Sequence, residues 1–525
     1  MKHVTAIGSG TAAAGRLGRP WGLLLALALV PCCGCTPAPQ TPGATTADEA
    51  QATPGAENET WHVIYIKGAK AGYQRTETKP VMRDGRQLLQ VEVLQHMVVL
   101  RDGEPTEMEV RATSIETPDG GLVEFDVESS RGPEPTRVSG RVVGDSLEIE
   151  RSTKGRKEPG SMPWSAADGG FYAGEQSLAR NPMKPGEERT IRALVPELYV
   201  LGTNRLVARE YESVQLLTGT SDLLRIDTVL AFPKELRAPP WEGSVWTDRS
   251  GEVIKSWMSA MNVETYRTTR AEALKEIEPG EFDLVRDLKV PVARPLPSPH
   301  ATKRVRYRVT VEDRDPLGVF VSGPSQKVQS IDPHTAEVTV YALRPGSEAG
   351  NADAADDPPT ADDLDPNNMI QSDYPAIAAK ARQVAGDERD PWAACVALER
   401  CAADTITESD YSQAFATAAE VIESGKGDCT EHAVLLAALC RARQIPARLA
   451  IGLVYIDRAF YYHMWTEVHV DGRWIALDAT RAQGGTGAAH LKMAHSNFKK
   501  ASALSAFLPV MQVIGKLRIE ILEVE

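Results

Sequence analysis

Short runs in which apolar and polar residues alternate fill the chain from residue 59 to about 300. Typical examples are LVEFDV at 122–127 and SLEIE at 146–150, with turn signals such as Pro118-Asp119-Gly120 between the runs. Alternation places successive side chains on opposite faces of a strand, so these runs predict antiparallel strands that each bury one face. We expect residues 59–300 to form a β-rich domain, with the shape of a half-barrel or a sandwich.

The pattern changes twice in the second half of the chain. Residues 301–345 predict an additional β segment, and residues 346–368 are acidic, rich in Ala and Pro, and typical of a disordered linker. The aspartates of that linker lack the EF-hand order of ligands, glycine and closing glutamate, so we expect no metal site there. From residue 369, apolar residues recur at helical spacing before strands return, which predicts an α+β domain over 369–525.

The N-terminal residues resemble an export signal. Residues 1–35 contain Arg16 and Arg19, then an apolar run that is too short to span a bilayer, and then small residues and cysteines. Cys35 follows Gly34, as in the lipobox of bacterial lipoproteins, and we expect it to carry the lipid. Cys32 is the alternative, although Pro31 precedes it. Residues 36–58 are rich in Pro, Thr and Ala, and predict a flexible tether to a membrane lipid anchor.

Composition excludes some functions. The 525 residues carry a formal charge of −14 and no basic stripe, which argues against nucleic acid as a partner. Four of the seven cysteines lie outside the leader: Cys395, Cys401, Cys429 and Cys440. Four cysteines at these spacings form no disulfide framework and no zinc motif, so we expect neither a metal nor a cofactor.

The stretch YYHMWTEVHVDGRWIALDAT at 461–480 predicts a hairpin with a specific register. Asp471-Gly472 is a strong two-residue turn signal, so Val470 should face Arg473. When the facing pairs are counted outward from this turn, the apolar residues lie on one face of the hairpin. His463 and Asp478 lie on the other face as diagonal neighbours. Diagonal positions lie about 7–8 Å apart, within reach of an imidazole and a carboxylate. The split into an apolar and a polar face supports this register, because a one-residue slip would scramble it.

A cysteine precedes this hairpin at a predicted helix start. In GDCTEHAVLLAALC, Asp428 is a good N-cap, and Glu431 completes a capping box, which places Cys429 in the first turn. The unpaired N–H groups and the helix dipole at that position favour a thiolate. Cys429 would attack a carbonyl carbon, His463 would relay the proton, and Asp478 would orient the imidazole.

These segments resemble the core of the bacterial transglutaminase-like superfamily, relatives of papain-type thiol enzymes. The matching positions are Gly427-Asp428-Cys429, Ile445-Pro446-Ala447-Arg448, Gly452, His463-Met464-Trp465, Trp474 and Leu477-Asp478-Ala479-Thr480. The resemblance implies a papain-like fold for 369–525 and a Cys429–His463–Asp478 triad. It also implies acyl transfer from an amide through a thioester, with the acyl acceptor left open. The stretch GAKAGY at 68–73 and the hairpin at 245–257 resemble β half-barrels of envelope lipoproteins.

Other residues near the triad admit alternative interpretations. His432, one helical turn after Cys429, could serve as the base, although no carboxylate is specified to orient it. His469 and Glu467 share the polar face but sit nearer the turn, so we expect them to be exposed. Trp465 and Trp474 could form the walls of a substrate groove or could only cover the sheet.

Three functions are compatible with these observations. The first is a cell-envelope cysteine enzyme, a protease or amidase acting on peptides or proteins. The second is a protein-crosslinking transglutaminase that joins glutamine side chains to amines. The third is a catalytically silent binding lipoprotein in which the β region carries the function.

Overall fold

The computed structural model describes residues 58–525 apart from 131–134, 196–197, 237–238, 278–281, 348–349, 352, 356, 411–414 and 500–506. The predicted leader with Cys32 and Cys35, and nearly all of the predicted tether, lie outside the described residues. Within the described part, no helix has the length and apolar character needed to cross a membrane.

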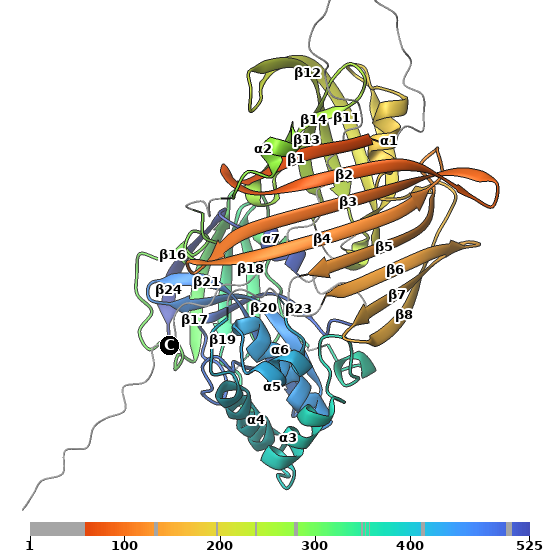
Figure 1. Ribbon diagram of the computed structural model, residues 1–525. Helices are drawn as coiled ribbons and strands as arrows, with labels where there is room; N and C mark the ends of the chain where they lie inside the picture. The colour runs from red at the N-terminus through yellow and green to blue at the C-terminus, as the bar shows by residue number, and fades with distance from the viewer. Residues whose placement is uncertain are drawn as a thin grey trace, which may run out of the picture.

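The N-terminal half forms one strongly curved sheet of fifteen strands in the order β8-β7-β6-β5-β4-β3-β2-β1-β15-β14-β13-β12-β11-β10-β9 (Figure 1). The first strands are β1 (Asn58–Ile66), β2 (Ala69–Arg83), β3 (Arg86–Arg101), β4 (Glu104–Glu116), β5 (Leu122–Ser130), β6 (Thr136–Val143), β7 (Ser146–Thr153) and β8 (Arg156–Pro163). The remaining strands are β9 (Asp168–Gly169), β10 (Glu188–Val195), β11 (Val200–Gln215), β12 (Thr220–Ala231), β13 (Trp241–Thr247), β14 (Val253–Met258) and β15 (Val263–Thr268). The predicted β-rich domain is therefore present, and its curvature is that of a half-barrel.

The hairpin turns of this sheet follow from local sequence. In Asp84-Gly85 both residues have positive φ, 51° and 74°, and in Asp102-Gly103 the values are 50° and 89°. Positive φ at both central residues is the geometry of a type I′ turn, whose twist matches that of the flanking strands. Asp tolerates this left-handed region and Gly adopts it without strain, so the dipeptides fix where each strand ends.

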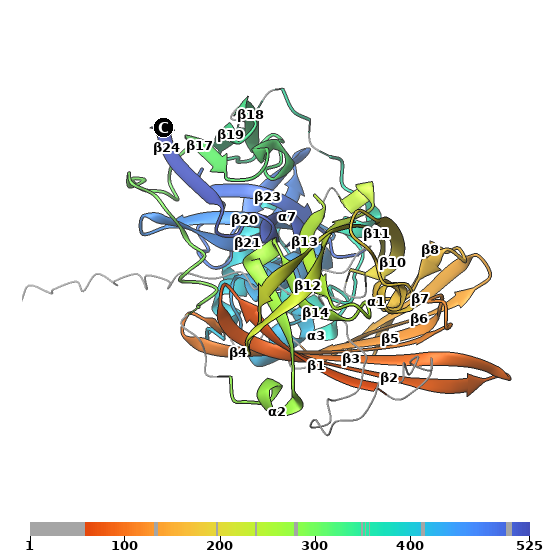
Figure 2. The ribbon, with the colours of Figure 1, turned by 90° about the horizontal axis from the view of Figure 1, so that it is seen from above.

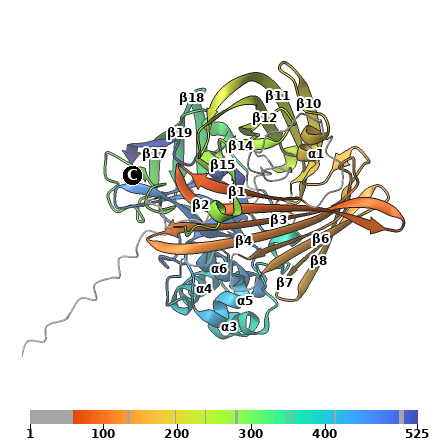
Figure 3. The same cartoon turned by 45° about the horizontal axis from the view of Figure 1, so that its top comes forward.

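Two helices belong to the N-terminal half: α1 (Ala173–Arg180) lies between β9 and β10 in the chain, and α2 (Arg270–Ala273) follows β15. Seen from above, β10–β14 curl away from the long strands β1–β4 (Figure 2). In Figure 3 those long strands cross the middle of the molecule, with β10–β14 on one side and the helices of the C-terminal region on the other. The N-terminal sheet therefore lies directly against the C-terminal region.

The C-terminal region contains two smaller sheets and a group of helices. One sheet has the order β16-β21-β20-β23, with β22 paired to β21, and the other has the order β18-β19-β17-β24. Their strands are β16 (Val290–Pro291), β17 (Arg304–Val311), β18 (Gln326–Asp332), β19 (Thr335–Tyr341), β20 (Ala447–Ile456), β21 (Ala459–Val470), β22 (Arg473–Leu477), β23 (His490–Ser496) and β24 (Leu517–Val524). The helices are α3 (Pro375–Ala385), α4 (Pro391–Thr405), α5 (Ala418–Ser424), α6 (Cys429–Ala442) and α7 (Leu508–Met511). The predicted segment 301–345 thus forms a small sheet that the last strand of the chain completes.

The acidic segment 346–368 differs from the disordered linker that we expected, because its described residues pack on the C-terminal region. Asp363 and Asn367 are buried, and the Asp363 carboxylate accepts hydrogen bonds from the amide and hydroxyl of Thr360. Asn367 Nδ2 donates to the carbonyl of Asn497 over 2.7 Å. Short polar side chains that cap turns and bond to the main chain can fix a segment without an apolar stripe.

One continuous apolar core joins the two halves. Ile64, Met97 and Val99 of the long strands belong to the same buried cluster as Val434 and Leu436 of α6. Because apolar contacts continue without a break from the sheet to the helices, the N-terminal sheet helps to hold the C-terminal region in place.

Candidate active site

The helix α6 starts at Cys429 and is buried from Cys429 to Arg441. Thr430 N donates to Asp428 Oδ1 over 2.7 Å, and Asp428 N donates to Glu431 Oε2 over 2.9 Å, which completes the predicted capping box. Gly427 precedes the cap with a φ of 153°, and a Cβ there would lie 2.3 Å from Glu431 Cβ. The chain can therefore enter the helix at this point only with glycine.

The predicted hairpin register is confirmed. The pairs Val470–Arg473, Val468–Ile475 and Thr466–Leu477 face each other across β21 and β22, and Asp471-Gly472 turns with φ values of 51° and 75°. The two diagonal side chains meet, since His463 Nε2 lies 2.9 Å from Asp478 Oδ2. Both side chains are almost completely buried. The polar face of the hairpin thus holds an imidazole against a carboxylate.

A gap in strand pairing lies beside His463. On the side of β21 that faces away from β20, the described pairing joins β16 at 459–460 and β22 from 466 onward. The amide of Met464, the next residue after His463, donates a hydrogen bond to the sulfur of Cys429 within this gap. Thr466 Oγ1 also donates to the carbonyl of Ala433 in α6, over 2.9 Å. These bonds fix the start of α6 against the strand that carries the imidazole.

The surroundings of Asp478 keep its carboxylate ionised. Burial alone would raise its pKa, but the charges and hydrogen bonds of His463 and His490 outweigh burial and hold the pKa well below its usual range. The other carboxylate oxygen accepts from the amide and hydroxyl of Thr480, at 3.1 and 2.6 Å. Asp478 N donates to Glu399 Oε1 of α4 over 3.0 Å, which fixes the main chain of the residue as well.

His490 on β23 is a neighbour that sequence reasoning missed. Its Nε2 lies 3.1 Å from Asp478 Oδ2, so two imidazoles share one carboxylate oxygen. Burial lowers the pKa of His490, which favours the neutral ring. Ligand atoms of His463, Asp478 and His490 all lie within 4.8 Å of one another, a group that a transition-metal ion could also bind. No local pattern around residue 490 signals this position.

The state of Cys429 differs from the thiolate that the helix terminus predicts. The side chain is fully buried, and burial, followed by the charge of Asp428, raises the pKa of the thiol well above its usual value. The Met464 amide and Arg101 act in the opposite direction but do not outweigh burial. In this conformation Cys429 is a protonated thiol that solvent does not reach.

Arg101, at the end of β3, is a second residue that sequence reasoning missed. Its guanidinium forms an ion pair with Asp428, and both side chains are buried. The turn that follows is anchored by Asp283, whose carboxylate accepts from Asp102 N at 3.1 Å and from Gly103 N at 2.7 Å. The tip of the β3–β4 hairpin therefore lies against the residue that caps the cysteine helix.

The expectation that Glu467 is exposed is wrong. The side chain is buried between Arg448, at 2.8 Å, and Lys492, at 2.6 Å. Burial would raise its pKa, but these two cations lower it further than burial raises it, so the carboxylate stays charged. His469 is half-buried and packs edge-on against Trp474. Opposite charges from β20 and β23 can thus hold a charged side chain inside a sheet face.

The two tryptophans and His432 occupy distinct environments. Trp465 stacks beside His463, with ring centroids 6.2 Å apart, and meets His490 edge-on at 5.2 Å. Trp474 lies under the Arg448 guanidinium at 4.0 Å, so it covers the sheet. His432 is buried, and its Nδ1 lies 2.6 Å from the Asp428 carbonyl one turn earlier in its own helix. Trp465 is thus a neighbour of the predicted triad.

Part of the chain matches a known protein family. Residues 378–479 match the Transglutaminase-like superfamily, a range that includes Cys429, His463 and Asp478. The chain therefore carries a transglutaminase-like domain, joined to an N-terminal β-rich region.

Among solved structures, the chain is similar to the periplasmic domain of TgpA from Pseudomonas aeruginosa, at 15% identity over 35% of this chain and 91% of that chain. It is also similar to a β-barrel-like protein of domain of unknown function DUF1849 from Brucella abortus, at 8% identity over 41% of this chain and 96% of that chain. The TM-scores are 0.24 and 0.31, which is too low to define the fold. No curated protein matches the chain.

Proposed function

We propose that the protein is a cell-envelope cysteine enzyme that cleaves or transfers amide bonds through a thioester on Cys429. The observation that carries this proposal is the 2.9 Å contact between His463 Nε2 and Asp478 Oδ2 on the strand beside the cysteine helix. Because the carboxylate holds Nε2, the other ring nitrogen, Nδ1, can exchange protons with the thiol. Within the described residues, this buried Nδ1 has no hydrogen-bond partner.

The reaction proceeds in two stages. His463 Nδ1 takes the thiol proton, the sulfur of Cys429 attacks the amide carbon, and the C–N bond breaks while the imidazolium protonates the leaving amine. Water or a second amine then attacks the thioester, giving up its proton to His463, and the thiol is restored. Asp478 stabilises the imidazolium and fixes its orientation throughout.

Main-chain N–H groups at the start of α6 stabilise the negative charge that develops on the substrate oxygen during the attack. Because the Thr430 N–H already donates to Asp428, the N–H of Cys429 itself is the natural oxyanion donor. The sulfur is covered in this conformation, so a substrate requires an opening beside the cysteine helix. Since the thiol is neutral when covered, proton transfer and opening are coupled.

The test combines a thiol-directed electrophile, a peptide mixture and mass spectrometry on the full chain. The electrophile should label Cys429, and Cys429→Ala should abolish both labelling there and amide turnover. Cys440→Ala is the matched control, because Cys440 is a buried thiol on the same helix and should be dispensable. Turnover that survives Cys429→Ala would exclude the mechanism. Failure of the electrophile to label Cys429 in the folded chain would favour a binding lipoprotein.

A labelled primary amine separates the two enzymatic alternatives. Release of shortened peptides without amine incorporation supports a protease or amidase, whereas incorporation without hydrolysis supports a protein-crosslinking transglutaminase.

Export and lipid attachment at Cys35 complete the proposal. Metabolic labelling with a fatty-acid analogue should mark the wild-type chain and should disappear in Cys35→Ser but not in Cys32→Ser. The opposite pattern would move the lipid to Cys32.

A further inference from the structure

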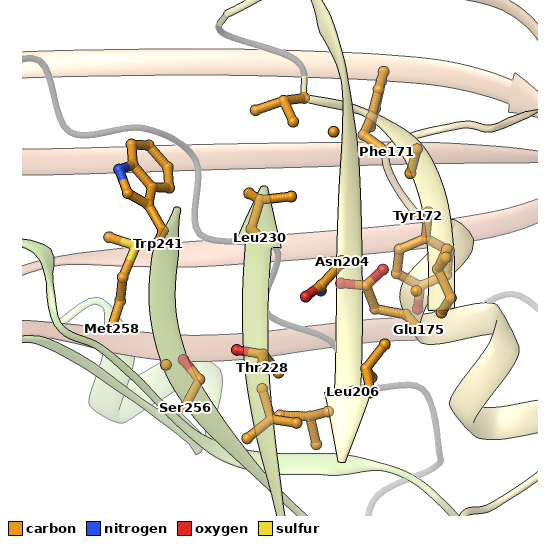
Figure 4. Close-up of a pocket in the computed structure, with 18 of the residues that line it drawn as sticks. Phe171, Tyr172, Glu175, Asn204, Leu206, Thr228, Leu230, Trp241, Ser256 and Met258 are labelled. Carbon is orange, nitrogen blue, oxygen red and sulfur yellow. The ribbon is translucent and has the colours of Figure 1, made fainter. Parts of the chain in front are cut away.

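A separate cavity lies inside the half-barrel, away from the cysteine helix. Its walls come from the concave side of β2–β4, from β10–β14, and from α1 at one end (Figure 4). The cavity volume is about 170 Å³. A protein cavity of roughly 150 Å³ admits benzene, so this half-barrel cavity has room for a ring or a short branched chain.

Most of the lining is apolar. Leu206, Leu230, Trp241 and Met258 project from the strands into the space that Figure 4 shows, and Phe171 closes the side near α1. Such a surface favours a ligand whose body is hydrocarbon, because burying both surfaces removes apolar area from water.

Several polar side chains interrupt the apolar lining, among them Glu175, Asn204, Thr228 and Ser256. Glu175 of α1 has an exposed fraction of only 7% and, within the described residues, its carboxyl group is bonded by its own main-chain amide. Asn204 of β11 lines the same cavity beside Glu175, and its buried Oδ1 has no hydrogen-bond partner among the described residues. A buried acceptor without a partner is costly, so Asn204 Oδ1 calls for a donor in the cavity. The Glu175 carboxyl, bonded by its own amide, can accept further hydrogen bonds.

The charge of the lining indicates which kind of hydrogen-bond donor a ligand should carry. The side chains around the cavity include two carboxylates, Glu175 and the rim residue Glu242, and the described residues of the lining include no Lys, Arg or His. An anionic head group would meet only like charge. A primary ammonium carries three donors and one positive charge, so it can satisfy both oxygens and neutralise Glu175.

We propose that the half-barrel cavity binds a small primary amine with an apolar body, whose ammonium group pairs with Glu175 and Asn204. This site is independent of the chemistry at Cys429. It gives the β-rich region a binding role of its own, whatever reaction the C-terminal region catalyses.

The pH dependence of binding follows from Glu175. Burial raises its pKa to about 7, with no charged neighbour among the causes. Besides Glu175, the titratable groups in the described lining are Tyr172 before α1 and Glu242 on β13. Glu116 on β4 and Arg189 on β10 form hydrogen bonds to α1. Because only the ionised carboxylate pairs with an ammonium, affinity should rise by about tenfold between pH 6 and pH 8.

The experiment is calorimetric titration of the full chain with three probes of equal size: benzylamine, benzyl alcohol and benzoate. The three leader cysteines are replaced by serine, so that no lipid is attached and no detergent competes for the cavity. Benzylamine should bind most tightly, and Glu175→Gln should weaken it at least tenfold and remove the pH dependence. Glu242→Gln is the matched control, since it removes the same charge at the exposed rim, and should change affinity less than twofold.

Asn204→Leu provides a second variant that leaves Glu175 in place. It should weaken benzylamine and leave benzyl alcohol unchanged. Equal or tighter binding of benzoate or benzyl alcohol would overturn the assignment of an amine. An equal loss in Glu242→Gln, or no binding of benzylamine at concentrations on the order of millimolar, would overturn the site.

Discussion

The buried ion pair between Arg101 and Asp428 supports a quantitative prediction. It joins the tip of the β3–β4 hairpin to the cap of the cysteine helix, and both side chains are at most 1% exposed. Arg101→Met keeps an apolar stem in the same space and removes the charge. The carboxylate of Asp428 is then buried without its cation.

Breaking a buried pair in this way costs about 3–5 kcal/mol, mostly because the remaining charge is desolvated. At about 1.4 kcal/mol for each factor of ten, this loss corresponds to an increase in local opening of roughly a hundredfold to four-thousandfold. Asp428→Asn should also be costly, although asparagine caps a helix as well as aspartate does, because it leaves the Arg101 guanidinium buried without its counterion. The double variant Arg101→Met/Asp428→Asn should recover most of the lost stability.

Hydrogen–deuterium exchange measures this opening directly. The informative amides are those of Thr430, which donates to Asp428, and of Gly103, which donates to Asp283. Both should exchange faster in Arg101→Met by the factor given above. Arg111→Met is the control, because that side chain is 46% exposed and its pair with Glu92 should contribute less than about 1 kcal/mol.

Two results would refute the reasoning. Exchange at Thr430 that accelerates less than tenfold in Arg101→Met would mean that the pair contributes little. A double variant as damaged as the single one would mean that Arg101 acts through packing and not through the charge of Asp428.

Three further predictions test the site and the half-barrel. Asp478→Asn should lower the rate of amide turnover by about three to four orders of magnitude, because an amide favours the wrong imidazole tautomer, and a steady-state assay measures this. Burial raises the pKa of Glu175 from 4.5 to about 7, so the folded chain loses stability as pH rises between those values, and the loss stays constant above them. Glu175→Gln should therefore be more stable at pH 8 by roughly 3 kcal/mol in urea denaturation and little changed at pH 4; an equal gain at both values would contradict the sign. A chelator should leave turnover unchanged, whereas loss of activity that added zinc restores would assign His463, Asp478 and His490 to a metal.

The parts of the site that sequence predicted are those encoded locally. The capping box of Asp428 and Glu431 and the Asp471-Gly472 turn each depend on residues within a few positions of one another. The register of β21 and β22 then follows by counting, and it brings His463 to Asp478 without further information. The strand pattern of the first half was likewise readable, because each hairpin carries its own turn.

The parts that sequence missed depend on contacts between distant segments. Arg101 and Asp428 are 327 positions apart, so no local pattern links them. His490 lies on a strand that reaches the site only through pairing with β20. The same holds for the burial of Cys429 and Glu467: a helix terminus and a turn-proximal face suggest exposure, and only the neighbouring strands cover them.

The shared core of the two halves has a consequence for how the molecule is made. Ile64, Met97 and Val99 share a buried cluster with Val434 and Leu436 of α6, which are synthesised more than three hundred residues later. Until α6 has been synthesised, the apolar side chains of the sheet that belong to this cluster are not covered by it, and exposed apolar surfaces associate with one another. Nascent chains that stop before α6 should therefore aggregate or recruit a chaperone, even though every strand of the large sheet is already complete.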